Sequence, residues 1–430
     1  MRTMKDSGIE WIGQIPQEWD VRKIKHCFNV YAGATPKSGN SEFWDGDIVW
    51  VTPADYTTEQ KYVSEGRKSI TSEGFESCST EMIPAGSLIF SKRAPIGLVA
   101  INTVDLCTNQ GCLSCVPLDK NDVEYFYYAF SSFTEQFDLY GSGTTFKEIS
   151  ADAFVNFPIP CPTIETQRNI SEYLRNRCAE IDALIAAKEK TNALLKERRQ
   201  SIIYEAVTKG LNPDAPMKDS ATEWIGEIPE NWGIAALKRV ATPSTGMTPS
   251  KANSQYWEGD IPWFSSKDIK ADYLFDSEDH ISQQAVDECG LTVHDENSVV
   301  FCARSGILRH TFPVSVLKCK GTINQDLRVL AASETIDPEF LMYYLRGMNN
   351  TIVTLYQKVG ATVESIEMEW LLYLPVVLPP KEDQKEIAEY IVARCNEIDS
   401  QIAANEISVQ KLKEYRQSII YEAVTGKIEV

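Results

Sequence analysis

Three cysteines provide the first spacing in this chain that could do chemistry. Cys112 and Cys115 are separated by two residues, with Cys107 just upstream, so their thiolates could bind zinc. A structural zinc site needs a second pair of ligands with similar spacing, and the sequence offers none. We therefore interpret the three residues as small apolar side chains on a strand. We expect all eleven cysteines to be reduced thiols, because disulfide frameworks belong mainly to small secreted domains.

The sequence also contains an internal duplication. KDSGIEWIGQIPQEW from Lys5 matches KDSATEWIGEIPENW from Lys218, and the match continues through GATPKSGNSEFWDGDIVW and GMTPSKANSQYWEGDIPW. The segment RQSIIYEAVT occurs identically from Arg199 and from Arg416. The repeated unit has roughly 215 residues, a period long enough to be a whole domain with its connecting helix. Two like units imply pseudo-twofold symmetry.

Several polar and aromatic residues recur in both copies. Four tryptophans form two matched pairs, which we interpret as core residues, since large shared aromatics most often fix packing. The other matched positions are an arginine after a β-branched run and an Asn-Gln dipeptide. The pairs are Trp44 and Trp257, Trp50 and Trp263, Arg93 and Arg304, and Asn109-Gln110 and Asn324-Gln325.

No catalytic motif accompanies these residues. The sequence has no GxxxxGK[ST] phosphate loop, no HExxH zinc helix and no GxSxG nucleophile turn. Each of the four histidines lacks a counterpart in the other copy; they are His26, His280, His294 and His310. We therefore expect a chain without a catalytic site of its own and without a bound metal or cofactor.

Short apolar runs separated by turn residues predict strands in each copy. Asp47 to Thr52, Ser87 to Phe90 and Gly97 to Ile101 are examples, bounded by Gly, Pro, Asn and Ser. Helical segments are predicted at Val123 to Phe133 and at Pro338 to Arg346. Each copy is therefore predicted to be a mixed α+β domain rather than an all-β barrel.

A long helix is predicted to follow each globular segment. Proline clusters mark the predicted helix starts, and Glu165, Glu382 and Asp383 fall in the first turns, where carboxylates favour the helix dipole. Apolar residues then recur at spacings of three and four, as in a coiled coil; they are Ile170, Leu174, Ile181, Leu184, Leu195 and Ile202 in the first copy, and Ile387, Ile391, Ile398, Leu412 and Ile419 in the second. At about 40 residues each helix would be about 60 Å long. Antiparallel pairing of the two helices would place the globular parts at opposite ends of a rod.

These patterns divide the chain into five segments. The globular domains are residues 1–158 and 217–375, the long helices are 159–209 and 376–430, and a linker with Gly210, Pro213 and Pro216 joins the copies. We place that linker at 210–216.

Composition indicates a folded chain with an acidic charge. It is 43% hydrophobic and 24% charged, with a formal net charge of −19. No stretch approaches the roughly 18 consecutive apolar residues of a membrane span, and the start lacks a secretory signal, so we expect a cytoplasmic protein. The acidic charge argues against a strong nucleic-acid binder, because such proteins carry basic surfaces. A groove with a few Lys and Arg side chains can still coexist with acidic outer faces.

The whole arrangement resembles the specificity subunits of type I restriction-modification systems, over nearly the whole chain. The resemblance rests on IPCPTIETQRNISEYL from Ile159, VVLPPKEDQKEIAEYI from Val376, the two EWIG-IP-W openings and the two RQSIIYEAVT segments. It implies that 1–158 and 217–375 are target-recognition domains, each reading one half of a bipartite DNA site. The helices would set the gap and dock two modification subunits, which bind S-adenosylmethionine and methylate adenine. Restriction subunits that cleave DNA with ATP and Mg²⁺ belong to the same implied assembly, and none of this chemistry lies in this chain.

Two domains that read different half-sites must differ where they touch base edges, which separates the candidate DNA-binding residues into two groups. Shared residues suit phosphate contacts, and these are Arg93 and Arg304, for which an ion pair is the alternative. Lys37 and Lys251 sit one position apart in the matched loops and could also hold the DNA backbone, with a solvated surface lysine as the alternative. Asn109, Gln110, Asn324 and Gln325 could pair with adenine, although a buried hydrogen-bonding role is favoured. Base reading is predicted in polar stretches that diverge, Tyr56 to Lys68 against Ile269 to Ser282 and Thr144 to Ser150 against Ala361 to Glu367. Within these stretches the candidates are Lys61, Arg67, Lys147 and Lys270.

For the helices, self-pairing and partner docking are compatible, since one face can pair while the outer faces bind. The candidate partner contacts are Gln167, Arg199, Gln384 and Arg416. Two other functions remain open. A coiled-coil scaffold that does not bind DNA would explain the acidic charge, and a fused nuclease or methyltransferase would need a metal site or nucleotide loop that the sequence lacks. Salt-dependent DNA retention would separate a DNA reader from a scaffold.

Overall fold

The chain folds into two compact units. The structure, a computed structural model, describes residues 2–93, 95–118, 121–143, 147–358 and 362–430. Unit 1 consists of Met1–Lys188 and Ile407–Val430, and unit 2 of Glu189–Glu406. The long helices α5 (Ile164–Lys209) and α11 (Lys381–Val424) therefore each contribute a part to both units, whereas the sequence-based division gave the helices segments of their own.

The globular part of unit 1 contains short strands and helices in chain order. They are β1 (Met4–Asp6), β2 (Gln14–Pro16), β3 (Asp20–Lys23), η1 (Ile24–His26), β4 (Phe28–Ala32), η2 (Ser41–Phe43), β5 (Trp44–Val51), β6 (Tyr62–Val63), β7 (Lys68–Ile70), α1 (Ser72–Glu76), β8 (Leu88–Ser91), β9 (Val99–Asn102), β10 (Cys107–Thr108), β11 (Cys112–Pro117), α2 (Val123–Ser132), α3 (Thr134–Leu139), α4 (Ala151–Val155) and β12 (Pro158–Cys161).

Unit 2 repeats this order. Its elements are β13 (Met217–Asp219), β14 (Glu227–Pro229), β15 (Gly233–Ala236), α6 (Leu237–Val240), β16 (Ala241–Thr245), η3 (Ser254–Trp257), β17 (Ile261–Phe264), β18 (Tyr273–Leu274), β19 (Asp279–Ile281), α7 (Gln283–Cys289), β20 (Val299–Cys302), η4 (Gly306–Arg309), β21 (Val314–Leu317), β22 (Thr322–Ile323), β23 (Leu327–Ala332), α8 (Pro338–Gly347), α9 (Asn349–Leu355), α10 (Met368–Leu371) and β24 (Pro375–Leu378).

The sheets of the two units have the same topology. A five-stranded sheet has the order β4-β11-β8-β9-β6 in unit 1 and β16-β23-β20-β21-β18 in unit 2. A three-stranded sheet, β10-β5-β7 or β19-β17-β22, packs beside it, and both sheets mix parallel and antiparallel pairs. The predicted mixed α+β fold and the duplication are confirmed. The strand and helix predictions at Asp47 to Thr52, Ser87 to Phe90, Gly97 to Ile101, Val123 to Phe133 and Pro338 to Arg346 all fall on elements of the matching type.

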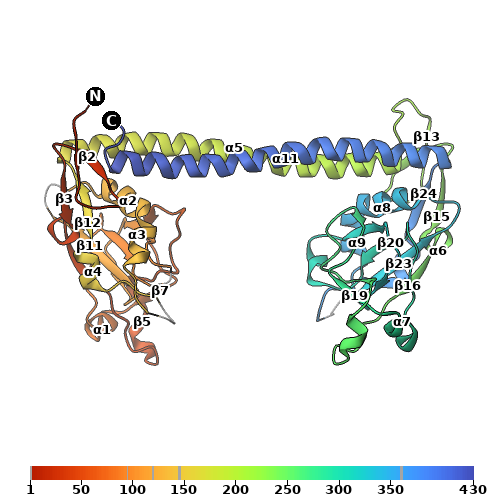
Figure 1. The fold of residues 1–430 in the computed structure, drawn as a ribbon, viewed down its shortest axis with the longest axis horizontal. Coiled ribbons are helices and arrows are strands. Elements are labelled where there is room, and N and C mark those ends of the chain that lie inside the picture. The colour runs from red at the N-terminus through yellow and green to blue at the C-terminus, as the bar shows by residue number, and fades with distance from the viewer. Residues whose placement is uncertain (1, 94, 119–120, 144–146, 359–361) are drawn as a thin grey trace. The chain divides into compact units, whose positions relative to one another are not determined.

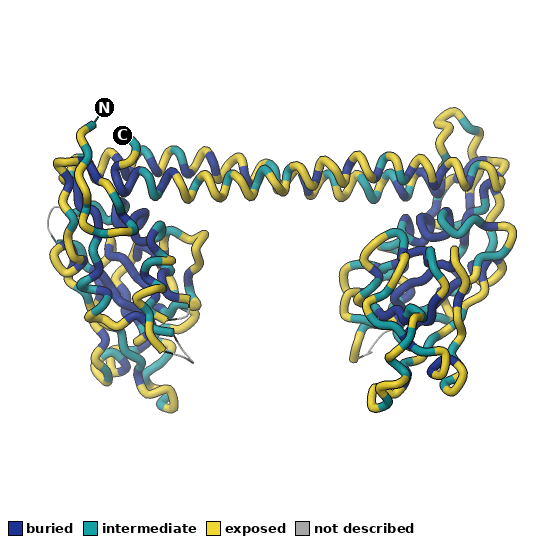
Figure 2. Tube along the Cα trace, in the orientation of Figure 1, coloured by how far each residue is buried: buried dark blue, intermediate teal, exposed yellow. Residues whose placement is uncertain are grey.

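A buried helix fills the core of each unit. In Figure 1, α2 of unit 1 and α8 of unit 2 each lie between the five-stranded sheet and the long helices. Buried residues follow the strands and this helix, whereas the loops at the end of each unit away from the long helices are exposed (Figure 2). In unit 1 the core is aromatic, with Phe90 in contact with Phe130, Phe137 and Phe154.

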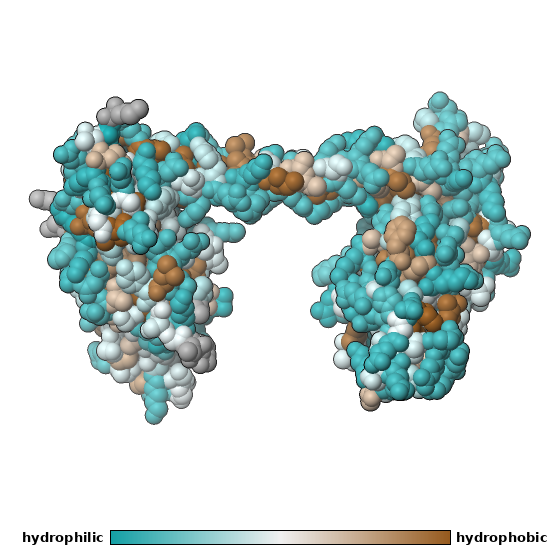
Figure 3. All heavy atoms as spheres, in the orientation of Figure 1, coloured by the Kyte–Doolittle hydropathy of each residue, from teal (hydrophilic) through white to brown (hydrophobic). Residues whose placement is uncertain are grey.

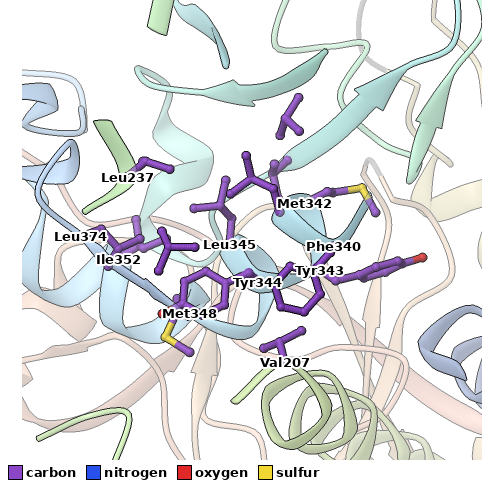
Figure 4. Close-up of a cluster of buried hydrophobic side chains, with 14 of the residues drawn as sticks. Val207, Leu237, Phe340, Met342, Tyr343, Tyr344, Leu345, Met348, Ile352 and Leu374 are labelled. Carbon is purple, nitrogen blue, oxygen red and sulfur yellow. The ribbon is translucent and has the colours of Figure 1, made fainter. Parts of the chain in front are cut away.

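The end of α5 completes the core of unit 2. Val207, which is fully buried, packs beside Tyr344, Tyr343 and Phe340 of α8 (Figure 4). In unit 1 the matching position of α11, Val424, is buried in the same way. The identical RQSIIYEAVT segments thus end in equivalent places, each against the core helix of its unit.

The two long helices pair antiparallel within each unit. In unit 1, Arg416 of α11 lies 2.9 Å from Asp182 of α5. Tyr125 joins β12, the strand that precedes α5, to the end of α11, since its hydroxyl is 3.0 Å from the carbonyl oxygens of both Pro160 and Val424. In unit 2 the equivalent ion pair joins Arg199 to Asp399 at 3.1 Å.

A regular buried stripe runs along each helix. It contains Ile170, Leu174, Cys178, Ile181 and Ile185 in α5, and Ile387, Ile391, Cys395, Ile398 and Ile402 in α11. Leu184, predicted in this stripe, is 54% exposed, and the neighbouring Ile185 takes the inward position because the stripe continues at a spacing of four. The prediction for Leu184 is therefore wrong.

The predicted helix starts also need a correction. Pro158 and Pro160 lie in β12, which pairs with β3, and α5 begins only at Ile164. In unit 2, Pro375 lies in β24 and α11 begins at Lys381, directly after Pro380. Each proline cluster therefore contributes to a short strand before the long helix begins. Proline is tolerated there because the strand lies at the edge of a two-stranded sheet.

A buried glutamine joins the start of each long helix to the core helix. In unit 1 the amide nitrogen of Gln167 donates to the carbonyl of Pro162 at 2.9 Å, and its amide oxygen accepts from the backbone nitrogen of Asp122 at 2.8 Å. Asp122 is the residue that caps the N-terminus of α2. One side chain therefore fixes both helix starts.

Gln384 makes the same connection in unit 2. Its amide nitrogen donates to the carbonyl of Pro379 at 2.9 Å, and its amide oxygen accepts from the backbone nitrogen of Asp337, the cap of α8, at 2.7 Å. Both glutamines are 1% exposed, so their side chains are used inside the units. The prediction that they contact a partner gains no support from these positions.

We predict that Gln384→Leu lowers the free energy of unfolding of unit 2 by about 1–3 kcal/mol, because it leaves buried backbone groups without hydrogen-bond partners. Urea denaturation of the chain measures this loss. Gln401→Leu, at an exposed glutamine of the same helix, is the matched control and should change stability little. Equal losses in the two variants would contradict the proposed role of Gln384.

We also predict a pH-dependent contribution from His294, which is 7% exposed and whose Nε2 has no hydrogen-bond partner among the described residues. Burial lowers the pKa of His294 below its ordinary 6.5, against the opposing effect of Asp295. The unfolded chain therefore binds a proton before the folded chain does, and stability is lost as the pH falls through 6.5 toward the folded pKa.

Ile83 occupies the equivalent bridge position in unit 1, so His294→Ile is the natural replacement. Urea midpoints of both proteins between about pH 7.5 and about pH 5 should diverge in favour of the variant as the pH falls. Parallel curves would show that His294 does not titrate in this way.

Candidate nucleic-acid interface

The matched tryptophans form one T-shaped pair in each unit. The ring centroids of Trp44 and Trp50 lie 5.2 Å apart, and those of Trp257 and Trp263 lie 5.0 Å apart. Trp50 and Trp263 are buried, which confirms the core interpretation for them. Trp44 and Trp257 are half-buried and lie at the rim of the three-stranded sheet.

The buried tryptophan holds a loop against the sheet. The indole nitrogen of Trp50 donates to the carbonyl of Ala34 at 3.0 Å, and that of Trp263 to the carbonyl of Met247 at 3.1 Å. Gly33 and Gly246 precede these carbonyls, and a Cβ at either glycine would lie within 2.3 Å of backbone oxygen atoms. Only glycine allows this close approach, so the Gly-x-Thr-Pro pattern of both copies has a steric cause.

The Asn-Gln dipeptides form the turn that these loops contact. Asn109 accepts a hydrogen bond from the backbone nitrogen of Gly111 at 2.9 Å, and Asn324 accepts from Asp326 at 3.0 Å. The asparagines thus shape the turn. The favoured buried hydrogen-bonding role is confirmed for Asn324, whereas Asn109 makes the equivalent hydrogen bond from a half-buried position.

The glutamines of the same dipeptides are exposed. The hydroxyl of Thr35 donates to the amide oxygen of Gln110, and that of Thr248 to the amide oxygen of Gln325 at 2.5 Å. Among the described residues, nothing accepts a hydrogen bond from either amide nitrogen. Each glutamine is therefore oriented by a threonine and keeps its donors free for a ligand.

A lysine lies over the outer tryptophan of each pair. The ammonium of Lys68 is 5.0 Å from the ring centroid of Trp44, and that of Lys251 is 5.9 Å from the ring of Trp257. The lysines come from different positions, because the strand register that pairs Lys68 with Trp50 places Asp279 opposite Trp263. Each unit thus places a lysine beside its outer tryptophan, but the two lysines come from non-equivalent positions of the chain.

We call these residues the tryptophan–glutamine surface of each unit. It consists of Thr35, Trp44, Lys68 and Gln110 in unit 1, over the buried Trp50, and of Thr248, Lys251, Trp257 and Gln325 in unit 2, over the buried Trp263. Lys68 ends the stretch Tyr56 to Lys68 that was predicted to read bases, but it was not named there as a candidate, and its counterpart in unit 2 is Asp279. Exposed cations, aromatic rings and amide donors are the groups that bind phosphates and base edges.

Lys61, predicted to read bases, is held inside unit 1. It is 19% exposed and lies 2.8 Å from Glu124, which also binds Tyr62 and Arg175. Burial acts to raise the pKa of Glu124, but the hydrogen bonds from Arg175, Lys61 and Tyr62 outweigh it and bring the pKa to about 2. Lys61 therefore stabilises α2 rather than presenting a free charge, and this prediction is not supported.

Two further predicted cations are paired. Arg93 donates to Glu148 at 2.7 Å, which confirms the ion-pair alternative, and Lys147 forms an ion pair with Asp138. Arg67 is 76% exposed, and its Nε lies 3.6 Å from Asp55.

Other candidates remain exposed. Lys37, Lys270 and Arg304 form no ion pair within the part of the chain that the structure describes. Lys270 borders a cavity of about 420 Å³ that Arg199 and Arg346 also line. Residues 144–146 and 361 of the predicted base-reading stretches lie outside the described residues.

The helix candidates Arg199 and Arg416 hold α5 and α11 together through the ion pairs described above. Their side chains are 25% and 31% exposed, so they keep limited surface for a partner.

Cys107, Cys112 and Cys115 lie buried in β10 and β11, which confirms their predicted strand setting. Burial raises the pKa of Cys107 to about 11 and that of Cys112 to about 12. Across the described ranges, no group of three or more His, Cys, Asp or Glu side chains could hold a metal ion.

None of the described helices is long and apolar enough to cross a membrane, and the face visible in Figure 3 is mainly hydrophilic.

Comparison with known proteins agrees with this organisation. A specificity subunit of the type I restriction enzyme MjaIX from Methanocaldococcus jannaschii is 28% identical, covering 97% of this chain and 95% of its own. The EcoBI specificity subunit from Escherichia coli is 22% identical over 80% of this chain and 76% of its own.

Solved structures share the fold. A chain from a type I R-M system, solved to explain complex assembly and conformational transition, matches with a TM-score of 0.76 at 16% identity, covering 96% of this chain and 99% of its own. The HsdS subunit from Thermoanaerobacter tengcongensis matches with a TM-score of 0.55 at 17% identity, covering 96% and 98%. The family model described as the type I restriction modification DNA specificity domain matches residues 16–196 and 229–406, so this chain belongs to that family.

Proposed function

We propose that this chain supplies DNA sequence specificity to a type I restriction-modification complex, with each unit reading one half of a bipartite target. The observation that carries the proposal is the tryptophan–glutamine surface, which occurs in both units with a shared framework and different flanking side chains. A shared framework suits contacts to the uniform phosphate backbone, and divergent side chains suit contacts to different bases.

The charges around the framework differ between the units. In unit 1 the surface includes Lys68, and Arg67 lies next to it in the chain. The equivalent strand of unit 2 carries Asp279, and Lys267 pairs with Glu278 and Asp279. Two surfaces with such different charges suit two different half-sites. A scaffold that does not bind DNA gives no reason for matched, exposed donors beside divergent charges.

Partner subunits complete the proposed complex. With a net charge of −19, the chain alone should bind DNA weakly, because long-range repulsion opposes the phosphates. Modification subunits would add the positive charge and bind S-adenosylmethionine, and restriction subunits with ATP and Mg²⁺ would cleave. This chain would then act without catalysis, in the cytoplasm, by selecting the site.

The test is genome-wide detection of methylated adenine in cells that express this chain with its cognate modification subunit. We expect a two-part motif that is methylated only when the chain is present. Methylation that does not depend on the chain, with an active modification subunit and both proteins folded, would favour the scaffold function instead.

We further predict that Lys251→Ala weakens binding of the assembled complex to target DNA and lowers the slope of log affinity against log salt by about one, as loss of one phosphate contact does. Binding to a labelled duplex at several salt concentrations measures both quantities. Lys320→Ala, at a lysine of the same unit that is 68% exposed and paired with Asp295, is the control. An unchanged slope for Lys251→Ala would remove this lysine from the interface.

A further inference from the structure

Arg328 lies directly beside the tryptophan–glutamine surface of unit 2. It belongs to β23, and its Nη1 donates to the carbonyl of Gln325 at 2.7 Å and to that of Leu327 at 2.6 Å. These two bonds fix the plane of the guanidinium next to the exposed Gln325. Its Nη2 and Nε have no hydrogen-bond partner among the described residues.

The charge of Arg328 is not neutralised by an ion pair. No described carboxylate lies within ion-pair distance of it, although the side chain is half-buried. Burial lowers the pKa of Arg328, with the nearby Asp326 acting in the opposite direction. A half-buried guanidinium without an anionic partner is costly, and such a cost is retained where a ligand supplies acceptors for the unpaired Nη2 and Nε.

The equivalent position of unit 1 holds a leucine. Leu113 pairs with Ala32 and Phe90 as Arg328 pairs with Thr245 and Phe301, and Leu113 is fully buried. The fold therefore does not need an arginine at this place. Arg328 distinguishes unit 2 from unit 1 at a position that the framework shares.

Unit 2 also has a serine, Ser365, in the place of the glutamate that pairs with Arg93 in unit 1. Glu148 of unit 1 pairs with Lys92 at 2.8 Å and bridges to Arg93, whereas Ser365 bridges to Arg304 in unit 2. In unit 1 one glutamate therefore pairs with both Lys92 and Arg93, whereas Arg304 of unit 2 has no ion pair among the described residues.

We propose that Arg328 is a specificity-determining residue of unit 2 that reads a guanine through its free Nη2 and Nε edge. This inference rests on the proposed function. Guanine presents two acceptors, N7 and O6, at the spacing that a guanidinium edge matches, and a guanidinium held in one plane selects for that pair. A phosphate contact would instead be expected at a position that both units share.

The experiment compares methylation motifs in cells that express the modification subunit with wild-type chain, Arg328→Leu or Arg328→Gln. Leucine is the residue that unit 1 carries here, and glutamine retains a donor for the carbonyl of Gln325 if leucine impairs folding. Arg309→Leu, at an arginine of unit 2 that is 65% exposed and paired with Glu364, is the matched control.

We expect both Arg328 variants to relax one G·C position in one half of the motif by about tenfold, the discrimination that one bidentate arginine supplies. The other half and the gap should stay unchanged, and the control should keep the wild-type motif. An unaltered motif, or a uniform loss of methylation at all targets without relaxation, would overturn the inference. A wild-type chain that directs no bipartite motif would instead overturn the proposed function itself.

Discussion

Each core depends on a helix segment that the other copy encodes. Ile203 and Val207, from the end of the first copy, are buried in unit 2, and Ile420 and Val424, from the end of the second copy, are buried in unit 1. Large buried apolar side chains contribute about 1.5–3 kcal/mol each, so neither core reaches its full stability without the exchanged segment. This exchange explains why RQSIIYEAVT is identical in both copies, since the same side chains must fit equivalent cavities.

The ion pairs and glutamine contacts follow from that exchange. Arg199 and Arg416 lie within the two RQSIIYEAVT segments and bind equivalent aspartates on the facing helix. Gln167 and Gln384 then fix where each long helix leaves its globular part. The position of the helix relative to the sheet within a unit is therefore determined at two points. Neither point involves the side chains that flank the tryptophan–glutamine surface, and these differ between the units.

The sequence was sufficient to predict the duplication, the mixed α+β domains and the long helices, because all three depend on periodicity and repetition. It could not predict the exchange of helix ends, which depends on contacts between residues about 300 positions apart, such as Tyr125 and Val424. Charged candidates were predicted less well. Lys61 and Arg93 proved to be paired with glutamates, because partners at long sequence separation decide whether a cation is free. Lys68 falls inside a predicted base-reading stretch, but the sequence did not single it out.

The exchange of helix ends also sets the order in which the units can be completed during synthesis. Residues 189–406 of unit 2 all leave the ribosome before Ile420 and Val424, which close the core of unit 1. The unit that begins first therefore finishes last, and its unfinished core stays open while about 200 residues are added, at a synthesis rate of about 5–20 residues per second. For tens of seconds the nascent chain exposes an apolar site shaped for one helix end, to which any other copy of RQSIIYEAVT nearby could bind.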